Sequence, residues 1–164
     1  MRNKRQVWVS LHSRGALSLG ANRTQLGYAA FHWGILISPK VSTGADCHAY
    51  DVTDSIILDS NSRTNLNSQN DWRFRHNPND DLERNAGILG MVMIGKVPND
   101  VSYDEIETHL ASLPLPDKDA QPAQNCVTWT MAAIGKLQGI GISKILMVPY
   151  LQKLFVDLYQ AGAR

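Results

Sequence analysis

Patterns typical of β-strands fill the first part of this chain, and patterns typical of α-helices follow them. Up to residue 97 the apolar residues occur in short segments, most of which alternate with polar residues, as strands with one buried face require. From residue 102 onward the apolar residues recur at helical spacing. This order favours an α+β protein. We therefore expect an antiparallel sheet of about five strands packed against C-terminal helices.

Five segments carry the strand signal, and turn-like stretches separate them. In the first segment Val7, Val9 and Leu11 share one face. The last segment is an almost continuous apolar run, which is typical of a central strand buried on both faces. Residues 15–28 and 59–71 are rich in small polar residues and predict loops, as do 40–46 and 77–85. The strands are expected at residues 5–14, 31–38, 47–53, 72–76 and 87–97.

Three helices are expected after the strands. Ser102 followed by Glu105 predicts a capping box that opens a helix to about Ser112. A second helix begins at or near Cys126 and ends near Gly139 or Gly141. Residues 142–164 predict a last amphipathic helix that packs its apolar face on the core.

Composition bounds the classes of protein that this chain can be. It has 164 residues, which we expect to form a single domain over 1–164 with a flexible basic start at 1–5. A formal net charge of +1 argues against a nucleic-acid binder. No signal peptide and no segment for stable membrane insertion is expected. With only two cysteines, we expect free thiols and a cytoplasmic protein.

Cys126 is the candidate nucleophile. It follows Asn125 at the expected start of a helix, where the partial positive charge of the helix N-terminus favours thiolate over thiol. The thiolate is the reactive form in covalent catalysis. Its own amide is the candidate oxyanion donor. The alternative is a cysteine that serves only as a small buried apolar residue.

Two histidines upstream complete a candidate catalytic set. His32 lies on the second expected strand and His48 on the third, across a short hairpin, so the two could be cross-strand neighbours. His32 would then be the general base and acid for Cys126, and His48 would orient it. Structural roles are the alternative for each histidine. The spacing of ligand residues argues against a metal site, and no cofactor is expected.

Several other polar residues are candidates for supporting roles. Asp51 could replace His48 as the orienting group, although it lies on the opposite strand face. Asn125, His12 and Tyr28 are candidates for oxyanion or orienting support. Arg73 and Arg75 could bind a substrate carboxylate, and a solvated strand face is the alternative. Both arginines lie on the fourth expected strand.

Three short stretches resemble the permuted papain-like thiol enzymes. These are residues 31–37, 47–52 and 125–129, which read Phe-His-Trp-Gly-Ile-Leu-Ile, Cys-His-Ala-Tyr-Asp-Val and Asn-Cys-Val-Thr-Trp. In the lecithin:retinol acyltransferase-like and NlpC/P60 group, a His strand, a second His strand and a later Asn-Cys helix start occur in this order. The resemblance, which extends to short fungal proteins of this arrangement, implies a permuted papain-like fold and a Cys126–His32–His48 triad. The acyltransferases usually carry a Glu-His-Phe-like continuation after the cysteine, where this chain has Val127-Thr128-Trp129.

These observations predict a cysteine-dependent hydrolase or acyl/amide transferase. It would act through a thioester on Cys126, on an amide or ester of a small molecule or peptide. Two alternatives stay open: a non-catalytic ligand-binding module of the same fold, and a cyclase or isomerase that uses the histidines as acid and base. The sequence does not indicate the oligomeric state.

Overall fold

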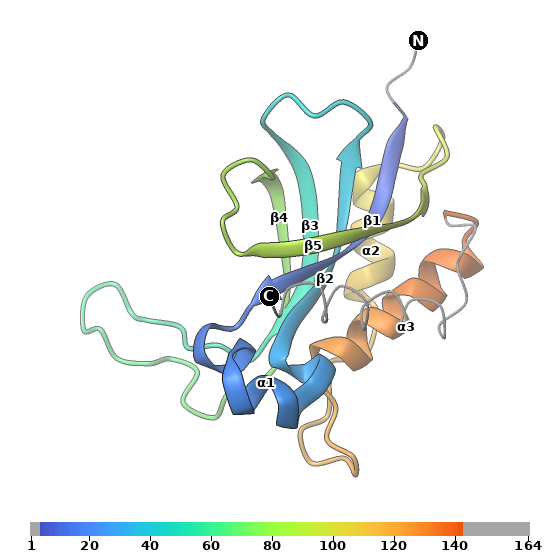
Figure 1. Cartoon of the computed structure of the whole chain (residues 1–164). Helices are drawn as coiled ribbons and strands as arrows, with labels where there is room; N and C mark the ends of the chain where they lie inside the picture. The colour runs from blue at the N-terminus through green and yellow to red at the C-terminus, as the bar shows by residue number, and fades with distance from the viewer. Residues whose placement is uncertain (1–3, 143–164) are drawn as a thin grey trace.

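The computed structural model describes residues 4–142, and it confirms the expected α+β architecture. Five antiparallel strands form one sheet in the order β4-β3-β2-β1-β5 (Figure 1). Neighbours along the chain pair with each other, except that β5 returns to pair with β1. The strands are β1 (Arg5–Ser13), β2 (Phe31–Pro39), β3 (Ala45–Thr53), β4 (Arg73–Asp81) and β5 (Ile88–Lys96).

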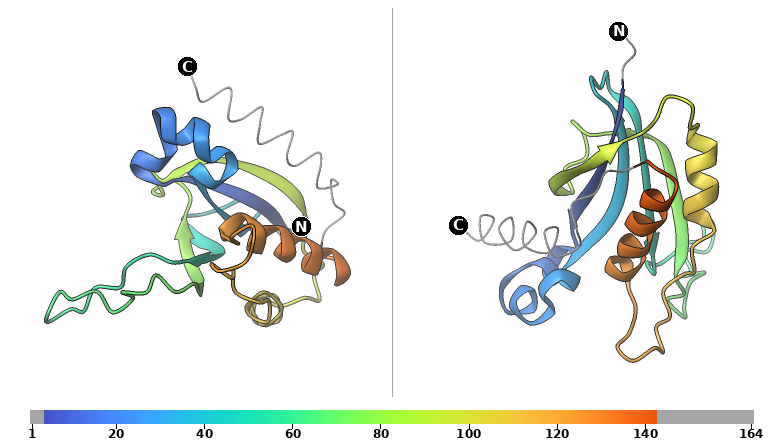
Figure 2. Two further views of the ribbon diagram at one scale, coloured as in Figure 1. Left: turned by 90° about the horizontal axis from the view of Figure 1, so that it is seen from below. Right: turned by 90° about the vertical axis from the view of Figure 1, so that its right-hand side faces the viewer.

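Two helices cover one face of the sheet (Figure 2). These are α2 (Tyr103–Ala111) and α3 (Cys126–Gly139). The predicted starts are confirmed, because Ser102 accepts a hydrogen bond from the amide of Glu105 and α3 begins at Cys126. The predicted helix over 142–164 falls, beyond Ile142, outside the described residues. Within the described part of the chain, no helix is long and apolar enough to cross a bilayer.

The core lies between the sheet and the two helices. Period-2 alternation places every second side chain of the central strands on this face. From β1 these are Val7, Val9 and Leu11, as predicted, and helix α3 adds its own buried side chains to the same core, mainly over β2 and β3. The large fully buried residues of the core include Trp33, Ile35, Ile37, Tyr50, Ile106, Trp129, Ile134 and Leu137.

The sequence-based expectation for β5 is wrong. This strand was predicted to be central, but it is an edge strand that pairs with β1. Its outer side chains Leu89 and Met93 are 55% and 40% exposed. An apolar run therefore does not fix the position of a strand in the sheet, and here β2 is the central strand, between β1 and β3.

Two further expectations need correction. Residues 15–28 were predicted to be a loop, but they contain α1 (Gly20–Leu26) between two 3-10 turns, Gly15–Ser18 and Gly27–Ala30. Residues 77–85 were predicted to be a polar turn, but β4 continues to Asp81 with register shifts against β3. Polar residues suit this strand because it lies at the edge of the sheet, where one side is solvated.

The expected flexible start at residues 1–5 lies mostly outside the described part. Arg5, its last residue, is the first residue of β1 and donates hydrogen bonds to the carbonyl oxygens of Pro98 and Val101. Arg5 is therefore held by the segment before α2.

Candidate active site

Cys126 is the first residue of α3. Its neighbour Asn125 caps the helix, because its side-chain oxygen accepts from the amides of Val127 at 2.9 Å and Thr128 at 3.4 Å. Thr128 completes a capping box by accepting from the Asn125 amide at 3.3 Å. The Cys126 side chain is buried, and its sulfur lies 3.8 Å from the carbonyl oxygen of Phe31. The thiol therefore lies at the helix N-terminus, beside the first residue of β2.

His32 occupies the next position on β2 and contacts a carboxylate of β3. Its Nε2 lies 2.8 Å from Oδ2 of Asp51. Ile35 pairs with Tyr50, so the same register continued by one residue sets Gly34 opposite Asp51. A Cβ on Gly34 would lie 3.3 Å from the Asp51 Cβ and 3.1 Å from the Tyr50 carbonyl oxygen. The missing side chain at Gly34 thus leaves room for the contact between His32 and Asp51.

Asp51 is held on its other side by Arg75 of β4. The two residues are directly opposite each other in the sheet. Arg75 Nε donates to Oδ1 at 2.8 Å, and Nη2 donates to Oδ2 at 2.7 Å. This two-pronged pairing is the strongest geometry for a guanidinium and a carboxylate.

These contacts shift the pKa values of both groups. Burial lowers the pKa of His32, but the hydrogen bond to Asp51 and the nearby Cys126 outweigh it and raise the pKa to about 9. Burial raises the pKa of Asp51, but the hydrogen bonds from His32 and Arg75 lower it to about 2. At neutral pH the pair is therefore an imidazolium next to a carboxylate.

His12 lies across from His32 on β1. The two residues are paired in the register, and their ring centroids are 6.0 Å apart. His12 Nε2 lies 3.0 Å from the hydroxyl of Ser10. Burial and the positive charge of His32 lower the pKa of His12. The structure therefore brings His12 to the site, as a group that is neutral where His32 is charged.

The structure contradicts the predicted contact between His32 and His48. His48 pairs with Ile37, so it lies on the helix-covered face and several residues along the strand from His32. Its ring stacks on Tyr103 of α2 at 3.5 Å between centroids, and its Nδ1 lies 2.9 Å from Nε2 of His76. Asp51 occupies the place beside His32 that was expected for His48.

The remaining candidates have local roles. Tyr28 lies in the turn Gly27–Ala30, where its carbonyl oxygen accepts from the indole of Trp33 at 3.1 Å. Asn125 caps α3. Arg73 donates to the carbonyl oxygen and hydroxyl of Ser55, at 2.8 and 3.1 Å. The second cysteine, Cys47, is fully buried and unpaired, so the prediction of free thiols is confirmed.

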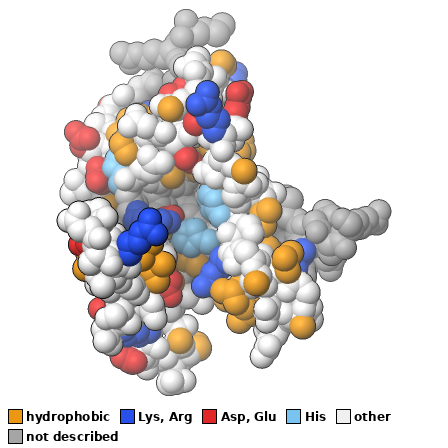
Figure 3. All heavy atoms as spheres, turned by 90° about the vertical axis from the view of Figure 1, so that its left-hand side faces the viewer, with side chains coloured by type: hydrophobic (Ala, Val, Ile, Leu, Met, Phe, Trp, Pro, Cys, Tyr) orange, Lys and Arg blue, Asp and Glu red, His pale blue; other side chains and the backbone are white. Residues whose placement is uncertain are grey.

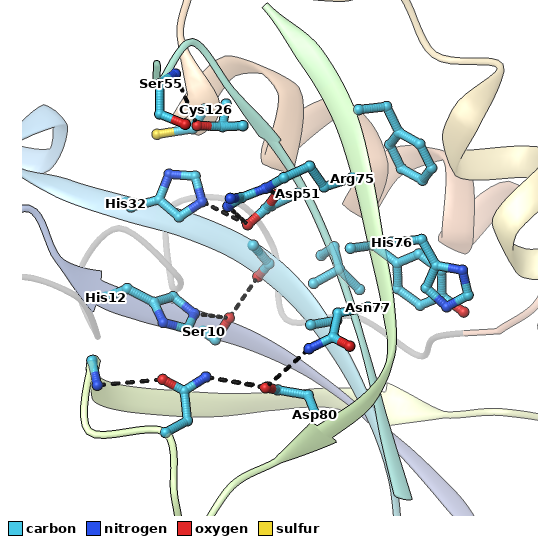
Figure 4. Close-up of a pocket in the computed structure, with 18 of the residues that line it drawn as sticks. Ser10, His12, His32, Asp51, Ser55, Arg75, His76, Asn77, Asp80 and Cys126 are labelled. Carbon is cyan, nitrogen blue, oxygen red and sulfur yellow. Dashed lines mark hydrogen bonds and ion pairs between the residues drawn. The ribbon is translucent and has the colours of Figure 1, made fainter. Parts of the chain in front are cut away.

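A cavity of about 1030 Å³ connects these groups. Figure 3 shows histidine and basic side chains gathered around a hollow on this side of the molecule. In Figure 4 the imidazole of His32 lies between Cys126 and His12, with the Asp51–Arg75 pair beside it. The walls of the cavity are mixed: polar residues such as Ser10, Asn77 and Asp80 line one part of it, and apolar residues such as Trp72 and Phe74 line another. Within residues 4–142, no group of three or more His, Cys, Asp or Glu side chains could hold a metal ion.

Sequence reasoning missed two contributions to this site. One is the role of Arg75: the sequence made it a candidate for a substrate carboxylate, or a solvated strand residue, whereas in the structure it binds the Asp51 carboxylate. The other is Gly34, whose signal was a glycine inside an otherwise apolar strand, and such a glycine often marks the close approach of another group.

The family match covers most of the chain. The sequence pattern of a family of unknown function, DUF6914, matches residues 4–147. The chain belongs to DUF6914. No curated protein and no solved structure matches it. The matched residues include every member of the candidate site, from His12 to Cys126.

Proposed function

We propose that this DUF6914 chain is a cysteine-dependent hydrolase or acyl/amide transferase that forms a thioester on Cys126. One observation carries the proposal: the imidazole of His32 lies next to the Cys126 thiol at a helix N-terminus (Figure 4), and its Nε2 lies 2.8 Å from the Asp51 carboxylate. A nucleophile, a base and a group that orients the base are the three parts that thiol catalysis requires.

In the first step the Cys126 thiolate attacks the carbonyl carbon of an amide or ester, and the carbonyl oxygen takes the displaced electron pair. The intermediate then collapses: the carbon–nitrogen or carbon–oxygen bond breaks, and His32 gives its proton to the departing amine or alcohol. A raised pKa suits this role, because His32 carries the proton when the leaving group needs it. The product is a thioester on Cys126.

In the second step neutral His32 accepts a proton from water, an amine or an alcohol. The nucleophile attacks the thioester carbon, the carbon–sulfur bond breaks, and the thiolate is restored beside protonated His32. Asp51 stabilises the imidazolium and fixes the ring so that Nε2 faces the carboxylate, which leaves Nδ1 for the sulfur. Water gives hydrolysis, and an amine or alcohol gives transfer.

The start of α3 would supply the oxyanion donor. The Asn125 side-chain oxygen accepts hydrogen bonds from the amides of Val127 and Thr128. The Cys126 amide would therefore donate to the negative oxygen that forms on the substrate carbonyl. A backbone amide at this position also benefits from the partial positive charge of the helix N-terminus.

The arrangement supports kinship with the permuted papain-like thiol enzymes. A strand histidine comes first in the chain, a residue of the next strand orients it, and a helix-initial cysteine follows much later. The orienting residue is Asp51, where the resemblance implied His48. The cavity offers both polar and apolar walls, which suits an amide or ester of a small molecule or peptide that carries both kinds of group. Free thiols suit a reducing compartment, so we place the protein in the cytoplasm.

An activated ester tests the proposal without knowledge of the natural substrate. We expect p-nitrophenyl acetate to acetylate Cys126 in the unchanged protein, and peptide mapping by mass spectrometry to locate the acetyl group there. His32→Ala should slow acetylation by about 100-fold or more, as the loss of general acid–base catalysis does. The matched control is Cys47→Ala, which removes the other buried thiol and should leave the rate unchanged.

Two outcomes would contradict the proposal. Acetylation of Cys126 no faster than that of free cysteine would show that the site does not activate the thiol. Once a substrate is found, turnover that survives Cys126→Ala and is lost in His32→Ala would instead show acid–base chemistry by the histidines, as a cyclase or isomerase uses.

A further inference from the structure

We propose that Arg75 is a positioning residue of this site, which holds the Asp51 carboxylate in the orientation that keeps the His32 ring directed at Cys126. The inference rests on the proposed function, and it adds a fourth member to the set of Cys126, His32 and Asp51. Arg75 itself does not touch the reacting atoms.

The geometry of the carboxylate carries this inference. Oδ2 of Asp51 serves two partners at once, His32 Nε2 at 2.8 Å and Arg75 Nη2 at 2.7 Å. Oδ1 accepts from Arg75 Nε at 2.8 Å. The carboxylate of an aspartate turns about a soft torsion. Two parallel bonds from one planar guanidinium fix that torsion, and a single bond from His32 would leave it free.

The fold brings Asp51 and Arg75 together whether or not a ligand occupies the cavity. Asp51 and Arg75 are cross-strand partners on β3 and β4, so strand pairing sets the distance between them. The Asp51 side chain is largely buried, with 18% of its surface exposed, whereas that of Arg75 is 49% exposed. A half-exposed arginine that makes both of its bonds to a buried carboxylate is more than a solubilising group, because it has given up part of its hydration to make them.

Removal of Arg75 has two opposite effects on His32, and their signs separate the hypotheses. If Arg75 only neutralises charge, its loss leaves the negative charge of Asp51 without a positive partner, and the pKa of His32 rises. If Arg75 positions the carboxylate, its loss lets Asp51 turn away from His32, and the pKa of His32 falls from about 9 toward 6.5. The direction of the change is therefore the readout.

The chain offers a matched control on the same strand face. Arg73 lies two residues before Arg75, and it also makes two hydrogen bonds through its guanidinium, but to Ser55 rather than to Asp51. Arg73→Met removes the same charge and the same number of donors close to the site. It should leave the pKa of His32 unchanged.

The experiment is a double-mutant cycle read by NMR titration of His32 and by the pH dependence of Cys126 alkylation with iodoacetamide. Arg75→Met should lower the pKa of His32 by at least one unit and slow alkylation at pH 7 by about tenfold. In an Asp51→Asn background the same substitution should change neither readout, because the residue through which Arg75 acts is already neutral. Arg75→Lys, which keeps the charge without the fork, should restore the pKa only in part.

Three results would overturn the inference: a rise in the pKa of His32, an equal change in both backgrounds, or an equal change from Arg73→Met. If Arg75→Met does not fold, Arg75→Lys supplies the same test by itself, since full retention of the pKa and the alkylation rate would overturn the inference. None of these readouts needs turnover. Acetylation of Cys126 in the unchanged protein tests the proposed function separately, so the two can fail independently.

Discussion

The sheet carries a histidine cluster on each of its faces, and the two clusters differ in what the imidazoles touch. On the face opposite α2 and α3, called the open face below, His32 contacts the Asp51 carboxylate at 2.8 Å. On the helix-covered face His48 contacts the ring of His76 at 2.9 Å and stacks on Tyr103. A carboxylate neighbour raises the pKa of His32 despite burial, whereas burial and the His76 ring lower the pKa of His48. Identical side chains on adjacent strands are thereby prepared for opposite charge states.

The cluster on the covered face has a structural explanation. His76 bonds Glu107 of α2 at 2.9 Å through Nδ1, and His48 stacks on Tyr103 of the same helix with an interplanar angle of 2°. Both contacts join α2 to the sheet. The cluster on the open face lies beside Cys126 at the cavity, whereas a carboxylate partner by itself does not mark the candidate site, because His76 has one as well.

The largest contrast should come from removing one histidine at a time. If the proposed function is right, His32→Ala should reduce the rate of Cys126 alkylation at pH 7 by about 100-fold, because the sulfur loses the imidazole beside it. His48→Ala should leave that rate within about twofold. The measurement is the second-order rate with iodoacetamide, with circular dichroism to verify folding. Equal losses in the two variants would break the comparison.

The titration of the two histidines should differ in direction. In an NMR pH titration His32 should titrate near 9 and His48 below its ordinary value of 6.5. The sign for stability follows from linkage. His32 contributes stability that is fully present below pH 6.5 and is lost as the pH rises through 9. His48 acts in reverse, because its charging below pH 6.5 favours the unfolded chain. Coincident titration curves would contradict the assigned environments.

Adding one methyl group at Gly34 should damage the open-face cluster alone. The new Cβ of Gly34→Ala would lie 3.1 Å from the Tyr50 carbonyl oxygen and 3.3 Å from the Asp51 Cβ. We expect about tenfold slower alkylation of Cys126 and a loss of about 1–3 kcal/mol of stability from overpacking. Gly135→Ala on α3 is the control, since its Cβ meets nothing within 4 Å and should stabilise the helix by up to about 1 kcal/mol. Unchanged alkylation in Gly34→Ala would show that Asp51 has room to adjust.

The smallest effect should come from the ion pair on the covered face. Glu107→Gln removes the charge that faces His76, and we expect it to lower the free energy of unfolding by at most about 1 kcal/mol because the pair is partly exposed. Cys126 alkylation should not change. Glu105→Gln on the same helix is the control for lost charge, and urea unfolding measures both variants. A large effect on alkylation would mean that the two clusters are coupled through the sheet.

Features that depend on neighbouring residues were predicted correctly from the sequence, whereas the register between strands was not. The start of α3 at Cys126 and the cap at Ser102 follow from neighbouring residues, and both are confirmed. The strand that holds His32 was also predictable from its apolar pattern. By contrast, the choice between His48 and Asp51 depends on the register of β2 against β3, which the hairpin loop sets. A shift by one residue exchanges the faces, and no local pattern encodes it.

Other errors have the same origin. The apolar pattern of β5 is genuine, but its place at the sheet edge depends on which strand pairs with β1. The role of Arg75 depends on a partner that lies 24 positions earlier in the chain. Helix α1 gave no periodic signal, and its limits are set by Gly20 and Gly27, which adopt positive φ values of 52° and 56°.

The long loop between β3 and β4 has a practical consequence. It leaves the sheet after Thr53 and returns at Arg73, and its base is tied by the amide of Asn67 to the carbonyl oxygens of Asp54, Ser55 and Asp71. The part of the loop outside these hydrogen bonds can change in length without moving the paired strands. A protease site, a fluorophore or an affinity peptide inserted around residues 59–65 would therefore leave the candidate site assembled.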